Sequence, residues 1–408
     1  MITAKALRTF APFAAAVLLA LTACDRKPLY LCDHGGIDIP MADIDLDVYW
    51  DYSIELGIDY EWKVEWQYGF DDYPAELSED KIGYSEPKGY NVYMYHKDTQ
   101  DGPYDNAKRG QTEGSMYSTP FDWGWYDILA WNEVEPDEEG IYSIVINEDN
   151  MYKPYAYTNR NAQGTDSRSR TRAEETRSDV HYQPDILYAA FDNDEEFNED
   201  LRGFYWDETR RRYIKNLAVE LQPMTFIYLP QLIIHHNSGR IAQPTGVAYI
   251  TGMAQQVDMV SGMTSKDTVT VDYNTYMHRN TPLIYTHDDG TRDTTEYADV
   301  IGGRCVTFGI PGRNPNEIYA LSRADNEKAN VNDSTHHQLE IQVVFNNGAD
   351  STLVFDVTDQ VRQKYRGGVI TVEIDMDHVP VPHKDTGSGS GFDAIVKEYE
   401  EEEHEIEM

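Results

Sequence analysis

Cysteine is scarce in this sequence: the 408 residues contain three, at Cys24, Cys32 and Cys305. A disulfide framework of the kind that holds small secreted domains together is therefore excluded. If Cys24 is modified, as argued below, only Cys32 and Cys305 could pair, and nothing in their spacing requires that they do. The fold has to be stabilised by a packed core and by sheet hydrogen bonds.

Basic residues are also few, because 34 Lys and Arg stand against 72 Asp and Glu, for a net charge of -38. Repulsion from phosphate would remove the counterion-release term on which nucleic-acid binding depends, so nucleic acid is excluded as a partner. The charge does not indicate disorder, since 30 Tyr, 12 Phe and 7 Trp supply enough aromatic area for packed cores. A chain of this length is expected to form two domains.

The motifs of common enzyme and cofactor sites are missing. There is no His-Glu-x-x-His, no P-loop and no Gly-x-Gly-x-x-Gly after a strand. Ser388 and Ser390 lie in a Gly/Ser tract, which is typical of a linker and not of a nucleophile elbow. The pairs His235–His236 and His336–His337 would point to opposite faces of a strand, so one pair cannot chelate one ion. We predict no catalytic residue, no cofactor and no metal at these positions.

One apolar run stands out, from Phe10 to Leu21, and it is too short to cross a bilayer. It follows Lys5 and Arg8 with no acidic residue between, which is the order of a signal peptide. The run ends in Leu21-Thr22-Ala23-Cys24, which resembles the bacterial lipobox. The alternative is a soluble periplasmic protein whose apolar run happens to end in cysteine.

The lipobox predicts that residues 1–23 are removed and that Cys24 becomes the acylated first residue, carrying palmitate-type chains. Several acyl chains anchor a protein stably where one does not. Residues 24–34 would be the lipidated tether to the membrane. The expected location is the outer membrane or the cell surface, outside the cytoplasm.

Period-2 alternation of apolar and polar residues dominates the rest of the chain and predicts strands. The clearest hairpin has strands around residues 339–345 and 353–357, joined at Asn347-Gly348, which favours a tight turn. Further strands are predicted at Ile44–Trp50, Trp62–Trp66, Tyr90–Tyr95, Trp125–Trp131, Ile141–Ile146 and Phe392–Val396. Helical periodicity is scarce. We therefore expect an all-β fold of two tandem antiparallel β-sandwich domains.

A polar stretch with five arginines, residues 159–179, has too few large apolar residues to order itself and predicts a linker. It would separate an N-terminal domain, residues 35–158, from a C-terminal domain, residues 180–408. The Gly/Ser tract, residues 386–391, predicts a second joint before the last strand. An acidic run follows it.

The chain resembles a family of uncharacterised Bacteroidales lipoproteins, catalogued as a domain of unknown function and related to fimbrillin-type adhesins and their anchor subunits. The segments that carry the resemblance are, in order, CDRKPLYLCDHGG, VYWDY, YNVYMYHKDTQ, FDWGWYDILAWNE, PTGVAYITGMAQQVDM, CVTFG, LVFDVTDQV and GFDAIVKEY. The resemblance implies two transthyretin-like sandwich domains, a surface location and fimbrial subunits as partners. It supplies no catalytic residues.

One departure from the stalk subunits concerns arginine. In those subunits an arginine-specific protease removes the first strand, and a neighbour's strand fills the groove. Here no arginine occurs between Lys27 and Lys108. This favours a protein that keeps its lipid, such as an anchor or a stand-alone surface protein. The segment after Gly391 could act as a donor strand or simply close the last domain, and pairing within the chain is the commoner outcome.

Two ligand sites are suggested by local composition. Asp192, Asp194 and Glu196 copy the alternate spacing of a calcium loop, although Phe197 stands where an EF-hand needs glycine; the alternative is a solvated acidic loop. Trp123, Trp125 and Tyr126 could stack against sugar rings, with Trp123 and Trp125 on one face of a strand. The alternative is that these aromatic side chains fill a core.

Four short Asp-Ser/Thr triplets resemble the O-glycosylation site that Bacteroidales use on exported proteins, at Thr268, Thr294, Ser334 and Ser351. All four lie in the predicted C-terminal domain, which would face outward. Together the patterns predict a non-enzymatic, membrane-anchored surface lipoprotein that contributes to adhesion or to fimbria assembly and anchoring. The alternative function is the binding of host or microbial surface glycans through exposed aromatics.

Overall fold

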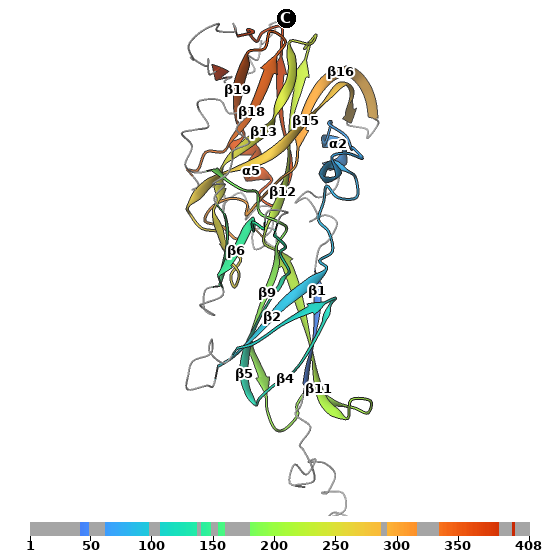
Figure 1. Ribbon diagram of the computed structural model, residues 1–408, viewed down its shortest axis with the longest axis vertical. Coiled ribbons are helices and arrows are strands. Elements are labelled where there is room, and N and C mark those ends of the chain that lie inside the picture. The colour runs from blue at the N-terminus through green and yellow to red at the C-terminus, as the bar shows by residue number, and fades with distance from the viewer. Residues whose placement is uncertain are drawn as a thin grey trace, which may run out of the picture.

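The computed structural model shows an elongated, mostly β molecule with the first main sheet at one end and the second at the other (Figure 1). It describes residues 41–48, 62–97, 107–136, 140–147, 154–159, 180–286, 292–315, 334–382 and 394–395. Several predicted features lie outside these residues: Cys24 and Cys32, residues 160–179 of the linker, and the Gly/Ser tract. Within the described residues, no helix is both long and apolar enough to span a membrane.

The first sheet has the strand order β3-β2-β5-β9-β11-β1-β4, with β10 beside β11. Its strands are β1 (Met41–Val48), β2 (Gly89–His96), β3 (Lys108–Glu113), β4 (Met116–Pro120), β5 (Gly124–Asn132), β9 (Tyr188–Phe197), β10 (Phe204–Asp207) and β11 (Arg212–Pro223). The two ends of this order come together, because a Cβ on Gly110 in β3 would lie 2.2 Å from the Tyr117 ring in β4. The sheet is therefore nearly barrel-shaped.

The second sheet has the order β17-β12-β16-β15-β13-β18-β19-β21, with β20 beside β12 and β8 beside β15. Its strands are β8 (Val180–His181), β12 (Phe226–His235), β13 (Ile241–Ala254), β15 (Thr268–Thr286), β16 (Arg292–Gly303), β17 (Cys305–Thr307), β18 (Gln338–Phe345), β19 (Asp350–Asp356), β20 (Gly367–Asp375) and β21 (Ala394–Ile395). A three-stranded sheet contains β6 (Ile144–Asn147), β7 (Tyr155–Thr158) and β14 (Gln256–Asp258).

Both main sheets are mixed, where purely antiparallel sheets were expected. In the first, β1 pairs in parallel with β11, and in the second, β12 pairs in parallel with β20. Parallel neighbours are joined by a long crossover, so they are distant in the sequence. The alternation of apolar and polar residues shows which face of a strand is buried but not which strand lies beside it or in which direction that strand runs. Strand existence was therefore predictable here, and strand direction was not.

The predicted hairpin is confirmed: β18 and β19 pair antiparallel on either side of Asn347-Gly348. Gly348 has φ +76°, the left-handed conformation that glycine adopts without strain. The expected last strand is present as β21, which pairs in parallel with β19 at Leu353 and Val354.

The predicted strand at residues 62–66 is wrong, because Trp62–Glu65 forms the short helix α2. Trp62 and Trp66 are both buried, while Lys63 is exposed. Residues four apart lie on the same face of a helix and also on the same face of a strand, so the two tryptophans are compatible with both structures. The segment is too short for its alternation with Lys63 and Glu65 to distinguish a helix from a strand.

Residues 62–88, which we call the crossing segment, lie between β1 and β2 of the first sheet in the sequence but pack on the second sheet. The segment contains α2 and the short helix η1 (Ala75–Leu77). Figure 1 shows α2 beside β15 and β16. Buried residues of this segment and of both main sheets share one core cluster, which includes Trp66, Ile44 and Leu229. The two sheets are thus joined by a common core.

The sheets do not divide the chain at residues 159–179, where a linker between two domains was expected. β5 pairs with β9, so the first sheet takes strands from both sides of that stretch. The change from the first sheet to the second falls between β11, which ends at Pro223, and β12, which begins at Phe226. The division into two domains stays a prediction.

Candidate functional site

A cleft of about 250 Å³ lies between the crossing segment and the second sheet. Four elements line it: the α2 region, β12, β15 and β20. The lining residues are Glu65, Gln67, Gln231, Ile233, Leu283, Tyr285, Thr371 and Glu373. Tyr285 is 40 % exposed at this cleft, so an aromatic face is open to solvent there.

Strand register explains how β12 and β20 share the floor of the cleft. Gln231 lies opposite Thr371, and Ile233 lies opposite Glu373. Positions two apart on a strand face the same side of the sheet, so all four side chains point toward the crossing segment.

Gln231 holds the crossing segment against the sheet. Its Oε1 accepts hydrogen bonds from the backbone N–H of Gln67 at 2.8 Å and of Tyr68 at 3.2 Å. Its Nε2 donates to the Glu65 carbonyl at 2.7 Å and to the Thr371 hydroxyl at 2.9 Å. The side chain is fully buried, and its amide makes four hydrogen bonds there.

Other contacts fasten the same segment. The Lys364 Nζ donates to Glu65 Oε2 at 2.7 Å, and the Gln67 amide bonds the backbone of Ile284 in both directions. His278 stacks on Tyr68 with ring centroids 4.1 Å apart and lies 2.8 Å from Asp71. The polar groups of Gln231, Gln67 and Glu65 in the walls of the cleft are therefore bonded to other protein groups.

His235 lies at the end of β12, beside the cleft. Its Nδ1 is 2.8 Å from Glu296 and its Nε2 is 3.1 Å from the cleft residue Glu373. Burial disfavours the charged imidazolium, yet the hydrogen bonds to the two carboxylates outweigh it and raise the pKa of His235. Protonated His235 would bridge β20 and β16 across β12.

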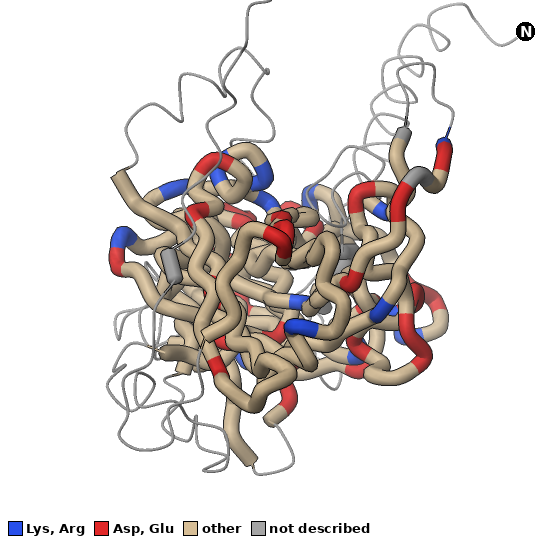
Figure 2. Tube along the Cα trace, turned by 90° about the horizontal axis from the view of Figure 1, so that it is seen from above, with Lys and Arg blue, Asp and Glu red and all other residues tan. Residues whose placement is uncertain are grey.

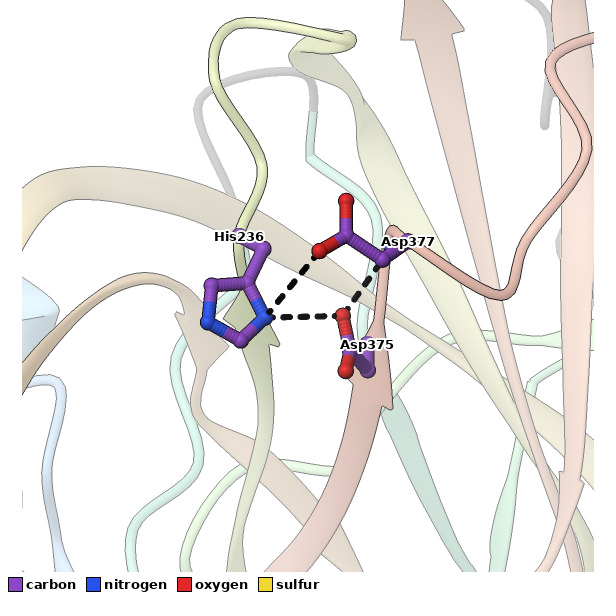
Figure 3. Close-up of side chains that lie close together, drawn as sticks. All are labelled: His236, Asp375 and Asp377. Atoms are coloured by element: carbon purple, nitrogen blue, oxygen red, sulfur yellow. Dashed lines mark hydrogen bonds and ion pairs between the residues drawn. The ribbon is translucent and has the colours of Figure 1, made fainter.

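His236 faces a different pair of carboxylates (Figure 3). Its Nδ1 is 2.9 Å from Asp375 and 3.8 Å from Asp377. The hydrogen bond to Asp375 raises the pKa of His236. In the described part of the chain, these three side chains are the group whose ligand atoms all lie within 4.8 Å of one another and could hold a metal ion.

No family model and no curated protein matches this chain. Solved structures match it at low identity. One, called a "putative adhesin", is from Bacteroides ovatus, at 14 % identity and TM-score 0.46, and the match covers 89 % of this chain and 98 % of that one. Another of that name, from Bacteroides thetaiotaomicron, matches at 10 % identity and TM-score 0.43, over 84 % of this chain and 94 % of that one.

The fimbrial anchor protein Mfa2 from Porphyromonas gingivalis matches at 8 % identity and TM-score 0.33, over 82 % of this chain and 90 % of that one. The structural matches therefore include adhesin-named proteins and a fimbrial anchor, the classes of protein that the sequence motifs resemble. All three TM-scores are below 0.5.

The three aromatic residues proposed for glycan binding differ in burial. Trp125 is 40 % exposed, whereas Tyr126 is fully buried and its hydroxyl donates to the Asp122 carbonyl at 3.0 Å. Trp123 is half-buried, with its ring 5.6 Å from Phe121. It comes directly before β5, which begins at Gly124. Glycan binding by Trp123, Trp125 and Tyr126 stays a prediction.

The calcium candidates lie on a strand, β9, and not in a loop. Asp194 pairs with Lys97 at 2.6 Å, and the neighbouring Glu195 pairs with Lys215 at 2.7 Å. Lys215 also donates to the backbone carbonyl of Glu196 at 2.8 Å, and burial raises the pKa of Asp192. Lysine ammonium groups thus neutralise part of the negative charge of this acidic run. Calcium binding by Asp192, Asp194 and Glu196 stays a prediction.

The four O-glycosylation candidates all lie in or next to the second sheet. Thr268, Thr294 and Ser334 are exposed, and Ser351 in β19 is half-buried. Glycosylation at these positions stays a prediction. Cys305 is buried and unpaired.

The sequence reasoning missed the cleft and both histidine clusters. The residues that line the cleft come from positions 65–67, 231–233, 283–285 and 371–373, which are adjacent only after the strands pair. The available signal was that His235–His236 ends an apolar strand and that Glu373, Asp375 and Asp377 end another. Nothing in the sequence says that the two strands are parallel neighbours.

Proposed function

We propose that this chain is a non-enzymatic, membrane-anchored surface protein that contributes to adhesion or to the assembly and anchoring of fimbriae. The observation that carries the proposal is the position of β1. It is the first described element after the predicted lipid tether, and it lies inside the first sheet between β11 and β4. All eight of its residues, Met41–Val48, pair with β11.

This position suits a protein that is pulled by its tether. A force on the N-terminus along β1 would load the hydrogen bonds to both neighbouring strands together, because the strand runs alongside both. Side chains add to the hold. Buried Asp43 accepts hydrogen bonds from Ser118 at 2.6 Å and from Arg210 at 2.8 and 2.7 Å, which connects β1 to β4 and to the residues before β11.

The distribution of arginine supports retention of β1. No arginine lies between Lys27 and Lys108, so an arginine-specific protease has no site in the segment that joins the tether to the first sheet. The nearest upstream arginine is Arg26, and cleavage there would release the chain from Cys24 without freeing a strand. This favours an anchor or a stand-alone surface protein over a stalk subunit, and the two transthyretin-like sandwich domains remain part of the same proposal.

Intact cells treated with trypsin test the proposal. We expect mass spectrometry to find Cys24 acylated as the first residue, and cleavage within residues 160–177. The two fragments should still elute together from a sizing column and separate only in denaturant, because β5 pairs with β9 across the cut. An unmodified N-terminus, or complete protection on intact cells, would contradict a surface anchor. Fragments that separate without denaturant would contradict the shared sheet.

Glycan binding is a second candidate, and the exposed face of Trp125 favours it. Ring stacking on one tryptophan contributes modestly, so we expect Trp125→Ala to weaken binding to a surface polysaccharide by about tenfold. Trp206→Ala is the matched control, since Trp206 is similarly exposed, 42 %, on β10. Equal binding by the wild-type chain and both variants would exclude Trp125 as the binding residue.

A further inference from the structure

We propose that His236, Asp375 and Asp377 bind a divalent transition-metal ion, with Zn²⁺ as the expected occupant. The three side chains converge on one point at the end of the second sheet that lies away from the first (Figure 3). This end is identified by chain direction, since β12 starts next to β11 of the first sheet and His236 follows its last residue.

The spacing of the ligand atoms fits a small ion. His236 Nδ1 is 2.9 Å from Asp375 Oδ1 and 3.8 Å from Asp377 Oδ2. An ion held about 2.0–2.2 Å from each of three ligands places neighbouring ligand atoms roughly 3–4 Å apart. The ligands therefore need little movement to close around it.

The backbone explains why these three residues meet. β12 and β20 are parallel neighbours, and His235 is in register with Asp375. His236, one residue further, has φ +51°, a conformation uncommon outside glycine, with its imidazole Nδ1 beside Asp375. Asp377 follows two residues after Asp375, and its backbone N–H donates to Asp375 Oδ1 at 2.9 Å.

Surrounding groups orient the ligands. The Arg240 Nη2 lies 3.3 Å from Asp377 Oδ1, which leaves Oδ2 on the side of His236. His378 Nδ1 lies 3.3 Å from Asp375 Oδ2, the oxygen that does not face His236. Outer contacts of this kind fix the direction of metal-binding side chains.

The ligand set selects the kind of ion. Imidazole nitrogen with carboxylate oxygens suits Zn²⁺ and its neighbours, whereas Ca²⁺ takes six to eight oxygen ligands. His236 and Asp377 have side chains that are 59 % and 57 % exposed, so water can complete the coordination shell. His235 is not part of the site, because its two ring nitrogens already face Glu296 and Glu373.

Calorimetric titration of ZnCl₂ into the full chain, freed of metal with EDTA, tests the site. We expect one saturable site per chain that is weakened about tenfold or more in His236→Gln and in the double variant Asp375→Asn/Asp377→Asn. Zn²⁺ should raise the melting temperature of the wild-type chain and not that of the variants. CaCl₂ should give no comparable binding.

His336→Gln is the matched control, because His336 is an exposed histidine outside the cluster. It should bind Zn²⁺ as the wild-type chain does. The variants replace surface side chains, and circular dichroism checks that each is folded. Absence of saturable binding overturns the proposal, and so does an equal loss in His336→Gln and His236→Gln. If the double variant is unfolded, Asp377→Asn alone should still show the loss, and wild-type affinity there also overturns it.

Discussion

Replacing Gln231 with leucine should lower the free energy of unfolding by about 3–5 kcal/mol. Leucine has a similar volume but no amide, so the backbone N–H groups of Gln67 and Tyr68 lose their acceptor, and the Glu65 carbonyl loses a donor. Each buried polar group left without a partner costs about 1–3 kcal/mol. Urea unfolding measures the loss.

The effect should be largest on the crossing segment. We expect hydrogen exchange at the N–H groups of Gln67 and Tyr68 to accelerate more than exchange at residues in β18, because the lost bonds hold that segment to the sheet. Gln222→Leu is the matched control. Gln222 is half-buried on β11, and its amide donates to the Glu220 side chain at the surface, so this change should stay within about 0.5 kcal/mol. Equal effects of the two substitutions would show that Gln231 does not hold the segment.

Replacing Gly367 with alanine should lower the free energy of unfolding by about 3 kcal/mol or more. Gly367 has φ +95°, and a Cβ there would lie 2.1 Å from the carbonyl oxygen of Ile227. The obstructing atoms belong to the backbone of β12, which cannot rotate aside as a side chain can. The left-handed conformation costs alanine about 1–2 kcal/mol, and overpacking costs about 1–3 kcal/mol more. Thermal and urea unfolding both measure this loss.

Gly114→Ala separates the two causes. Gly114 has φ +101°, but a Cβ there has nothing within 4 Å. It should therefore show only the conformational cost of about 1–2 kcal/mol. If Gly114→Ala and Gly367→Ala destabilise the chain equally, the contact between β20 and β12 at Ile227 is not as close as the structure has it.

The β18–β19 hairpin could be predicted from the sequence, because Leu339, Ile341 and Val343 alternate with polar residues ahead of the Asn347-Gly348 turn. β5 lacks this one-sided pattern, since its last seven residues are all buried. β9 contains the acidic run DNDEE, which suggests a loop, and in the sheet two of its carboxylates pair with Lys97, next to β2, and with Lys215 in β11. Asp43 alternates with Ile44, which by itself would put its carboxylate on the solvent-facing side of β1, yet it is buried and accepts hydrogen bonds from Arg210 and Ser118.

The candidate sites depend on pairing between distant strands, which composition does not encode. Adjacent residues on one strand, such as His235 and His236, point to opposite faces and cannot hold one ion together. Ligands from a second strand cannot be read from such a pair. Asp375 and Asp377 lie close to His236 only because β20 is a parallel neighbour of β12. Local periodicity cannot supply that register.

The pairing of β1 with β11 has a consequence for the order of folding. Among the described strands β1 comes first in the chain and its antiparallel neighbour β4 precedes β5, whereas β11 follows only after the chain from β5 to β10. Contacts of such long sequence separation slow folding, because the loop between them must be closed first. Until β11 arrives, one edge of β1 stays open to other strands. In a newly made chain that open edge can pair with a strand of a neighbouring chain until β11 reaches it.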